Sequence, residues 1–112
     1  MDLHLPDIPG ITARPYDRPG DAQLVADLVV AEAHADGRDD AVDSAEAVDL
    51  TFRTAENLDL EQGFRFVEVD GEAVAYVITR WYDEVDGPRA YRHLCKVKAA
   101  WRGKGIGTAM LT

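Results

Sequence analysis

The sequence predicts an α+β fold in which a strand and two helices are followed by a three-stranded antiparallel meander and the start of a third helix. Three observations support this prediction. Apolar residues recur at helical spacing in the first half of the chain, they alternate along strands after Gly63, and a glycine-rich segment follows the last strand. With 112 residues, 46% of them hydrophobic, the chain suits one domain. We expect residues 1–9 to form an N-terminal arm and residues 10–112 to form the fold.

A short strand and a first helix are expected at the start of the fold. Ile11–Arg14 predicts a strand, which Pro15 ends or confines to a sheet edge. Asp21 is expected to cap the helix that follows, and Gly37 to end it. The apolar residues of this helix share one face, which we expect to be buried: Leu24, Val25, Leu28 and Val29. Glu32 is expected on its solvated face.

A second helix is expected after an acidic loop, residues 36–43. Asp43 and Glu46 have the spacing of a capping box, which predicts the start of this helix. Its apolar face carries Val48, Phe52 and Ala55. Its end is expected near Leu60. We interpret the acidic loop as a solvated segment, because its spacing does not fit a calcium-binding EF-hand loop.

Three strands are expected in the second half of the chain. The first strand is predicted by Phe64, Phe66, Val67 and Val69. The pair Asp70-Gly71 is typical of a two-residue hairpin turn. The returning strand is expected over residues 73–81, a further turn over 83–88, and the last strand over 90–98.

The two signs of charge are unevenly distributed along the chain. The formal net charge is −9, but residues 1–86 carry 21 acidic and 6 basic residues, while residues 87–112 carry 6 basic residues and no acidic ones. The first segment is therefore at −15 and the second at +6. The acidic remainder would repel a long nucleic acid, whereas a small phosphorylated ligand meets only the basic end. The sequence favours a small anionic ligand and no nucleic acid.

No membrane partner is expected. No apolar run approaches the ~20 residues that cross a bilayer, and residues 1–6 lack the basic and apolar regions of a signal peptide. The single cysteine, Cys95, cannot form an internal disulfide, which agrees with a reducing compartment. We therefore expect a cytoplasmic protein, and we interpret Cys95 as a small apolar strand residue rather than a nucleophile.

The glycine-rich end of the chain carries the strongest motif. Gly103, Gly105 and Gly107 alternate after a strand, so successive backbone N–H groups can point into one concavity at the start of a helix. Such a loop is typical of a di- or polyphosphate site. A P-loop would need four residues between its first glycine and the Gly-Lys pair, and a dinucleotide fingerprint would need a glycine where Thr108 stands. A plain turn between strand and helix is the remaining alternative.

The pattern Arg102-x-x-Gly105-x-Gly107, after a strand containing Leu94-Cys95-Lys96-Val97, resembles the GNAT acyltransferase superfamily. Residues 66–77 are similar to the second strand, hairpin and third strand of that family. The resemblance covers roughly residues 10–112. It implies a GNAT-like mixed layer fold, of which this chain carries the N-terminal part and lacks the C-terminal part.

The same resemblance implies a binding site for acetyl-CoA as cosubstrate, with no metal. Backbone groups at Val97 and Ala99 would pair with the pantetheine arm. Arg102 would stand at the loop entrance, where it adds charge and shapes the turn. The pyrophosphate would be held by the N–H groups of Gly103, Lys104, Gly105, Ile106, Gly107 and Thr108.

The implied reaction is transfer of an acetyl group from acetyl-CoA to an unidentified amine, as in an N-acetyltransferase. Direct attack of the amine on the thioester needs a base, a donor for the oxyanion and an acid for the thiolate. The last strand offers no Asp or Glu, so Tyr91 and His93, which share one face by alternation, are the candidate base or water-relay residues. The acidic loop would lie beside the acceptor entrance, where it could attract a cationic amine. The alternatives are a non-catalytic acyl-CoA-binding or regulatory module, or half of a tandem pair.

The final helix is expected to need a partner. It has about eight residues from Gly105, fewer than the ~12–15 that are stable in isolation. Its apolar residues would leave an exposed patch: Ile106, Ala109, Met110 and Leu111. We therefore expect a truncated domain, inactive as a fragment, that is completed by another segment or chain or pairs as a homodimer.

Overall fold

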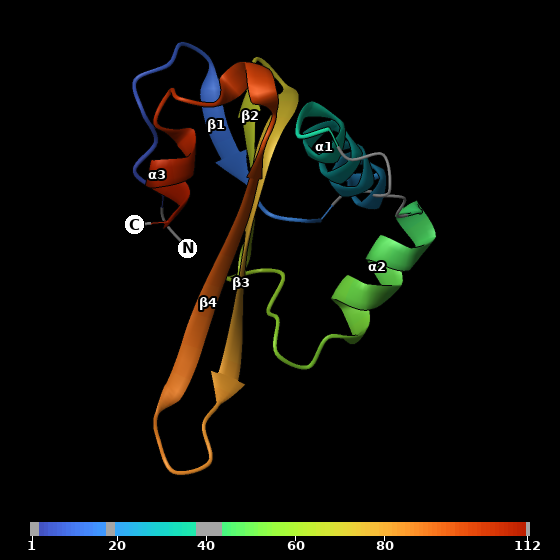
Figure 1. The fold of residues 1–112 in the computed structure, drawn as a ribbon, viewed down its shortest axis with the longest axis vertical. Coiled ribbons are helices and arrows are strands. Elements are labelled where there is room, and N and C mark those ends of the chain that lie inside the picture. The colour runs from blue at the N-terminus through green and yellow to red at the C-terminus, as the bar shows by residue number, and fades with distance from the viewer. Residues whose placement is uncertain (1–2, 18–19, 38–43, 112) are drawn as a thin grey trace.

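The chain folds as a four-stranded antiparallel sheet with helices on both faces, in a computed structural model that describes residues 3–17, 20–37 and 44–111. The elements in chain order are β1 (Ile11–Arg14), α1 (Asp21–Ala35), α2 (Ala45–Thr54), β2 (Phe64–Val69), β3 (Glu72–Asp83), β4 (Arg89–Val97), a 3-10 turn η1 (Ala99–Trp101) and α3 (Ile106–Leu111). The strand order is β1-β2-β3-β4. Figure 1 shows α1 and α2 beside one face of the sheet, with α3 and the N-terminal arm beside the other. The predicted α+β class is confirmed.

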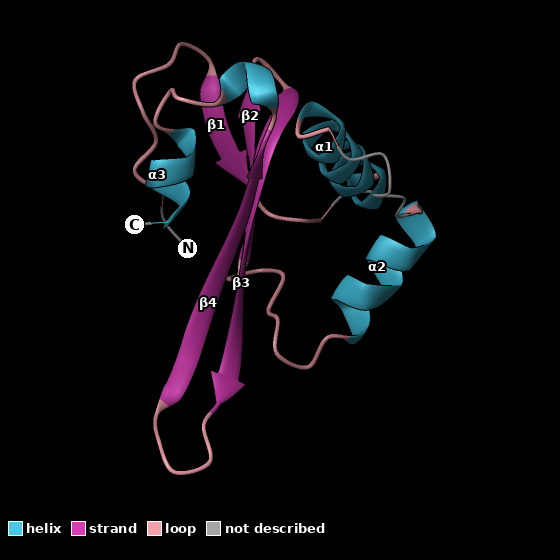
Figure 2. Cartoon of the chain, viewed as in Figure 1, coloured by secondary structure: helices cyan, strands magenta, loops and turns pink. Residues whose placement is uncertain are grey.

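The strands follow the sequence closely. β1 occupies the predicted residues at a sheet edge, with Pro15 directly after it. Asp70 and Gly71 both have positive φ, 53° and 86°, so the predicted two-residue hairpin turn is confirmed. β3 runs two residues further than predicted, because its ladder with β4 continues to the pair Asp83↔Arg89. The β3–β4 hairpin consequently extends beyond the helices (Figure 2).

The start of α1 differs from the prediction. The cap position is held by Gly20, with φ of 89°, and no side chain caps the helix. Asp21 is instead the first helical residue and is buried, with 1% exposed. Its two carboxylate oxygens accept hydrogen bonds from Arg14 of β1 at 2.8 and 2.9 Å. The assignment of Asp21 as a cap was wrong, because its side chain forms an ion pair with Arg14 of β1 instead.

The bounds of α2 also differ from the prediction. Ser44 caps the helix and accepts a hydrogen bond from the N–H of Ala47 at 3.1 Å, while Asp43 lies outside the described residues. The helix ends at Thr54, not near Leu60. The chain then runs along the lower part of β3, where Leu58 forms an isolated bridge with Arg80. Pairing with this strand ends the helix early.

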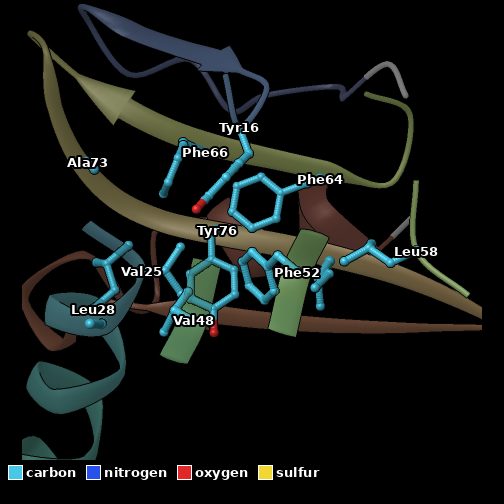
Figure 3. Packing of buried hydrophobic residues seen from close by; sticks show 12 residues of the cluster. Tyr16, Val25, Leu28, Val48, Phe52, Leu58, Phe64, Phe66, Ala73 and Tyr76 are labelled. Atoms are coloured by element: carbon cyan, nitrogen blue, oxygen red, sulfur yellow. The ribbon is translucent and has the colours of Figure 1, made fainter. Parts of the chain in front are cut away.

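An aromatic core fills the space between the sheet and the first two helices. Phe64 packs edge-on against Phe66 at 4.8 Å between ring centroids and stacks on Tyr76 at 5.6 Å. Tyr16 meets Phe52 of α2 and Phe64, each at 5.5 Å. Such pairs contribute about 0.5–1.5 kcal/mol each beyond their burial. Figure 3 shows these rings in one layer with Val25, Leu28 and Val48 from the helices.

A second core lies on the opposite face of the sheet and includes α3. Ile106 is 1% exposed, Met110 3% and Ala109 7%. Ile106 and Met110 pack with sheet residues and with the N-terminal arm, which contributes Leu3, Leu5 and Ile8. The prediction that these helix residues form an exposed patch was wrong, because the arm and the sheet bury Ile106 and Met110, and Ala109 is buried as well. The side chain of Leu111 lies outside the described part.

The buried hydroxyl of Tyr16 leads to a pH-dependent prediction. It donates to Asp49 Oδ1 at 2.7 Å, and hydrogen bonds from Tyr16 and Arg53 lower the pKa of Asp49. A carboxylate whose pKa is lowered by folding stabilises the native state above its unfolded pKa, about 3.9, and that stabilisation is lost as the pH falls through the folded pKa. Tyr16→Phe should therefore lower the free energy of unfolding at pH 7, with a smaller deficit at pH 3. Urea denaturation at both pH values checks this, and an equal deficit would contradict it.

Candidate functional site

The glycine loop joins the end of β4 to α3 by way of η1, which the sequence analysis did not predict (Figure 2). Backbone hydrogen bonds from Trp101 at 2.8 Å and from Arg102 at 3.2 Å close this 3-10 turn. Gly103 and Gly105 follow with φ of 75° and 88°. A side chain at such a φ costs roughly 1–2 kcal/mol. The backbone path itself therefore requires these two glycines.

A row of unused backbone donors follows the turn. Within the described part of the chain, the N–H groups from Gly103 to Gly107 donate to no other residue. The N–H of Ala109 bonds to the carbonyl of Gly105 at 3.0 Å. A cavity of about 190 Å³ lies beside the loop and is lined by Val97, Arg102, Gly103, Gly105, Gly107 and Thr108. Consecutive unpaired N–H groups at a concavity suit an oxygen-rich anion.

Gly107 differs from the other two glycines of the loop. It lies inside α3 and has no positive φ. A Cβ at this position would meet only Val97 Cγ2, at 3.9 Å, which is ordinary contact. Packing within the described chain therefore does not require a glycine here, but the missing side chain keeps the cavity open.

The two cations of the loop have distinct surroundings. Arg102 donates to Asp36 Oδ1 at 3.0 Å and to the carbonyl of Val97 at 3.4 Å, and the hydrogen bond to Asp36 is the largest cause that raises its pKa. It therefore ties the loop to the end of α1 and to the end of β4. Lys104 Nζ lies over the ring of Trp101, 6.0 Å from its centroid. The rest of the predicted acidic loop, residues 38–43, lies outside the described residues.

The open edge of β4 carries a contact that sequence reasoning missed. The N–H of Val97 donates to Glu32 Oε2 at 3.2 Å, and Lys96 Nζ lies 3.0 Å from Glu32 Oε1. The Glu32 side chain is only 15% exposed, so its assignment to a solvated helix face was wrong. Glu32 stands seven positions after Val25 and four after Leu28, which puts the three residues on one helix face, and this spacing is the signal that places it inward. Ala99, the other predicted pairing residue, is exposed in η1 and its carbonyl accepts from Arg102 at 3.2 Å.

The candidate base residues lie further along β4. Tyr91 and His93 are exposed and alternate with the same face as Val97, which packs on the core around α3. His93 Nδ1 lies 2.8 Å from Thr79 Oγ1 on β3. His93 stands four residues from Val97, which corresponds to about 14 Å along a strand. The structure therefore places this pair on the strand that leads into the loop rather than in the loop cavity.

Other reactive features lie away from this loop or are buried. Cys95 is half-buried, and burial is the largest cause that raises the pKa of its thiol. A larger hollow of about 460 Å³ lies between α1 and the β2–β3 turn and carries Asp27, Asp70 and Glu72, so its acids disfavour a phosphate. Among residues 3–17, 20–37 and 44–111, no three His, Cys, Asp or Glu side chains gather as metal ligands. No helix in these ranges has the length and apolar character to cross a bilayer.

The fold and the loop define a mixed α+β protein with a cavity of unpaired N–H groups after its fourth strand. The sequence profile of the acetyltransferase (GNAT) family matches residues 22–112. The chain belongs to the GNAT acetyltransferase family. A search of curated proteins found no match.

Solved structures with the same fold agree with this assignment. A GCN5-related N-acetyltransferase from Sphaerobacter thermophilus is 34% identical with a TM-score of 0.66, over 96% of this chain and 31% of its own. A GNAT family acetyltransferase from Brucella melitensis, in complex with acetyl-CoA, has a TM-score of 0.58 at 19% identity, over 90% of this chain and 63% of its own. The protein yncA from Salmonella typhimurium, with its cofactor acetyl-CoA, has a TM-score of 0.64 at 19% identity, over 91% of this chain and 59% of its own. The chain thus spans between about a third and two thirds of these three proteins.

Proposed function

We propose that this chain binds acetyl-CoA at the glycine loop and contributes to transfer of the acetyl group to an amine. The observation that carries the proposal is the row of N–H groups from Gly103 to Gly107, without partners in the described chain, beside an open cavity. Membership of the GNAT family and the acetyl-CoA present in two structures of the same fold support this choice of ligand.

The loop residues fit the pyrophosphate of acetyl-CoA by their chemistry. Backbone N–H groups would donate to its oxygens, together with that of Thr108. The positive φ of Gly103 and Gly105 and the open space at Gly107 let the anion approach the backbone. Arg102 holds the loop against α1 while its charge is balanced by Asp36. Lys104 supplies further positive charge near Trp101.

The edge of β4 would hold the pantetheine arm, with Val97 and Ala99 as pairing residues. Because the N–H of Val97 already donates to Glu32, pairing there requires this carboxylate to move. Lys96, which lies 3.0 Å from the same carboxylate, can hold Glu32 after it leaves the N–H. Glu32 is therefore proposed as a side chain that protects the strand edge while the arm is absent.

The acetyl donor supplies a thioester, and a residue of the chain must accept the proton that the amine loses. When the amine nitrogen bonds to the thioester carbon, the carbon–sulfur bond breaks, the sulfur leaves as a thiolate and the nitrogen loses a proton. His93 is proposed to take that proton through Nε2, since its Nδ1 lies beside Thr79. Tyr91, on the same face, is the second candidate for proton relay.

The role of His93 is tested by thiol release from acetyl-CoA with a panel of primary amines. We expect His93→Ala to lower kcat about 100-fold or more, with little change in the KM for acetyl-CoA. Tyr91→Phe is assayed in parallel to test proton relay. His34→Ala, at an exposed histidine of α1, is the matched control and should retain wild-type turnover. Turnover of His93→Ala at the wild-type rate would exclude His93 as the base.

A non-catalytic acyl-CoA-binding module, including half of a tandem pair, is the second candidate. The observation that favours it is the distance of the candidate base residues from the loop, with Tyr91 61% exposed. Saturable acetyl-CoA binding without thiol release for any amine of the panel would support this candidate over the transferase.

A further inference from the structure

Two arginines face each other across the β3–β4 ladder, on the face that carries α1 and α2. Arg80 and Arg92 are register partners. Ile78, two residues before Arg80 on the same face, belongs to the aromatic core under these helices. Like charges directly opposite each other in a sheet are destabilising. The repulsion between Arg80 and Arg92 therefore destabilises the fold unless an anion binds between them.

Neither arginine has a carboxylate partner within the described part of the chain. The Nε atom of Arg80 is buried and makes no hydrogen bond. Arg92 lies over the ring of Tyr82, 5.2 Å from its centroid, which fixes the guanidinium without neutralising it. Asp83, three residues after Arg80 on β3, pairs with Arg89 at 2.7 Å.

The two arginines also border a hollow with apolar walls. A hollow of about 360 Å³ is lined by Ile78, Arg80, Tyr82, Arg92, His93 and Leu94. Tyr82 and Leu94 are 44% and 51% exposed, so the hollow offers apolar surface beside its two cations. Arg80 also lines a second hollow of about 210 Å³ between α1, α2 and the sheet. A ligand in this region meets two cations and apolar surface, while the side chain of His93 lies on the opposite face of the sheet beside Thr79.

We propose that Arg80 and Arg92 bind an anionic group, a carboxylate or a phosphate, on the amine that accepts the acetyl group. Arg80 and Arg92 both line the hollow, and guanidinium groups match the oxygens of such a group. The inference rests on the proposed acetyl transfer, because the hollow lies along β4, the strand that leads into the glycine loop. It narrows the acceptor to an amine that also carries a negative charge, with an apolar segment against Tyr82 and Leu94.

NMR titration of the full chain tests the arginine site without any need for turnover. The probes are 6-aminohexanoate, O-phosphoethanolamine and hexylamine, the last of which lacks an anion, all at one ionic strength. We expect saturable shifts of the Nε–H signals of Arg80 and Arg92 with one or both anionic probes, and none with hexylamine. The stronger of the two anionic probes identifies carboxylate or phosphate as the preferred group.

Three single substitutions make the test specific. Arg80→Gln and Arg92→Gln should each weaken the anionic probe about tenfold or more. Arg89→Gln is the matched control, because it removes the same charge from the same hairpin at a guanidinium already paired with Asp83. Arg92 is exposed, so its variant remains informative if the Arg80 variant does not fold. The proposal would be overturned if the Arg92 variant bound the anionic probe as tightly as the wild-type chain. It would also be overturned if the Arg89 variant lost as much affinity as the Arg92 variant, or if hexylamine bound as tightly as the anionic probe.

Acetyl-CoA added to the same sample separates this proposal from the proposed function. Shifts at Gly103 to Gly107 without probe binding would overturn the anion site alone. If the probe bound at Arg80 and Arg92 but acetyl-CoA shifted no loop signal, the anion site would be supported. Its proposed role in binding the acceptor for acetyl transfer would be overturned.

Discussion

Gly107→Glu is expected to weaken acetyl-CoA binding at least about 100-fold, or ~2.8 kcal/mol, while the chain stays folded. The substitution places two methylene groups and a carboxylate in the cavity proposed for the pyrophosphate. It strains neither the backbone nor the core, because Gly107 has no positive φ and a Cβ there meets only Val97 at 3.9 Å. Isothermal titration of acetyl-CoA into both proteins measures the effect.

Gly107→Ala is the matched control for Gly107→Glu. It adds a Cβ without charge, so it should weaken binding less, and it should stabilise the helix by about 0.5–1 kcal/mol. Equal affinity of the wild-type chain and the Gly107→Glu variant would show that the ligand does not occupy this cavity. A large loss of thermal stability in either variant would contradict the geometry described for α3.

Asp21→Ala is expected to cost about 3–5 kcal/mol of unfolding free energy, a large fraction of the 5–15 kcal/mol of a typical domain. The side chain is buried, receives two hydrogen bonds from Arg14 and one from the N–H of Asp17 at 3.0 Å. Among the residues that the structure describes, its removal leaves the guanidinium of Arg14, 12% exposed, with Glu68 at 3.2 Å and the exposed Asp17 at 3.7 Å as carboxylate partners. Urea denaturation at pH 7 measures the loss.

Two further variants locate the cause of that loss. Asp27→Ala removes an exposed acid from the same helix and should change stability by no more than about 0.5 kcal/mol. The double variant Arg14→Met with Asp21→Leu removes both charges and should recover much of the stability lost in Asp21→Ala. A small effect of Asp21→Ala would show that the carboxylate acts as a simple surface group.

Local chemistry explains which parts of the fold could be predicted from the sequence. The turn at Asp70 and Gly71 follows from residues that tolerate positive φ, and β2 and β3 follow from alternation on either side. The end of α1 at a glycine is equally local, since Gly37 has φ of 77°. These elements need no knowledge of what packs against them.

The errors arose where a distant residue decides the outcome. Asp21 was predicted as a cap because its local context fits one, but Arg14 of β1 binds its side chain. The end of α2 depends on the pairing of Leu58 with Arg80, 22 positions apart. The burial of Ile106 depends on the N-terminal arm, whose prolines give no periodic signal.

The candidate site divides in the same way. The glycine loop was predictable because positive φ and open space select glycine at fixed positions. The contact of Glu32 with the N–H of Val97, 65 positions away, was not predicted from the sequence. The position of Arg80 opposite Arg92 in the β3–β4 ladder was not predicted either. Long-range geometry of this kind emerges only when the sheet and the helices are placed together.

The central claim is that the N–H groups of the glycine loop hold the pyrophosphate of acetyl-CoA. The most direct measurement is an amide NMR titration with acetyl-CoA and, separately, with S-acetylpantetheine, which lacks the pyrophosphate. We predict saturable shifts of the amides from Gly103 to Thr108 with acetyl-CoA and none at these amides with S-acetylpantetheine. Unchanged loop amides at saturating acetyl-CoA, or equal loop shifts with both compounds, would contradict the claim.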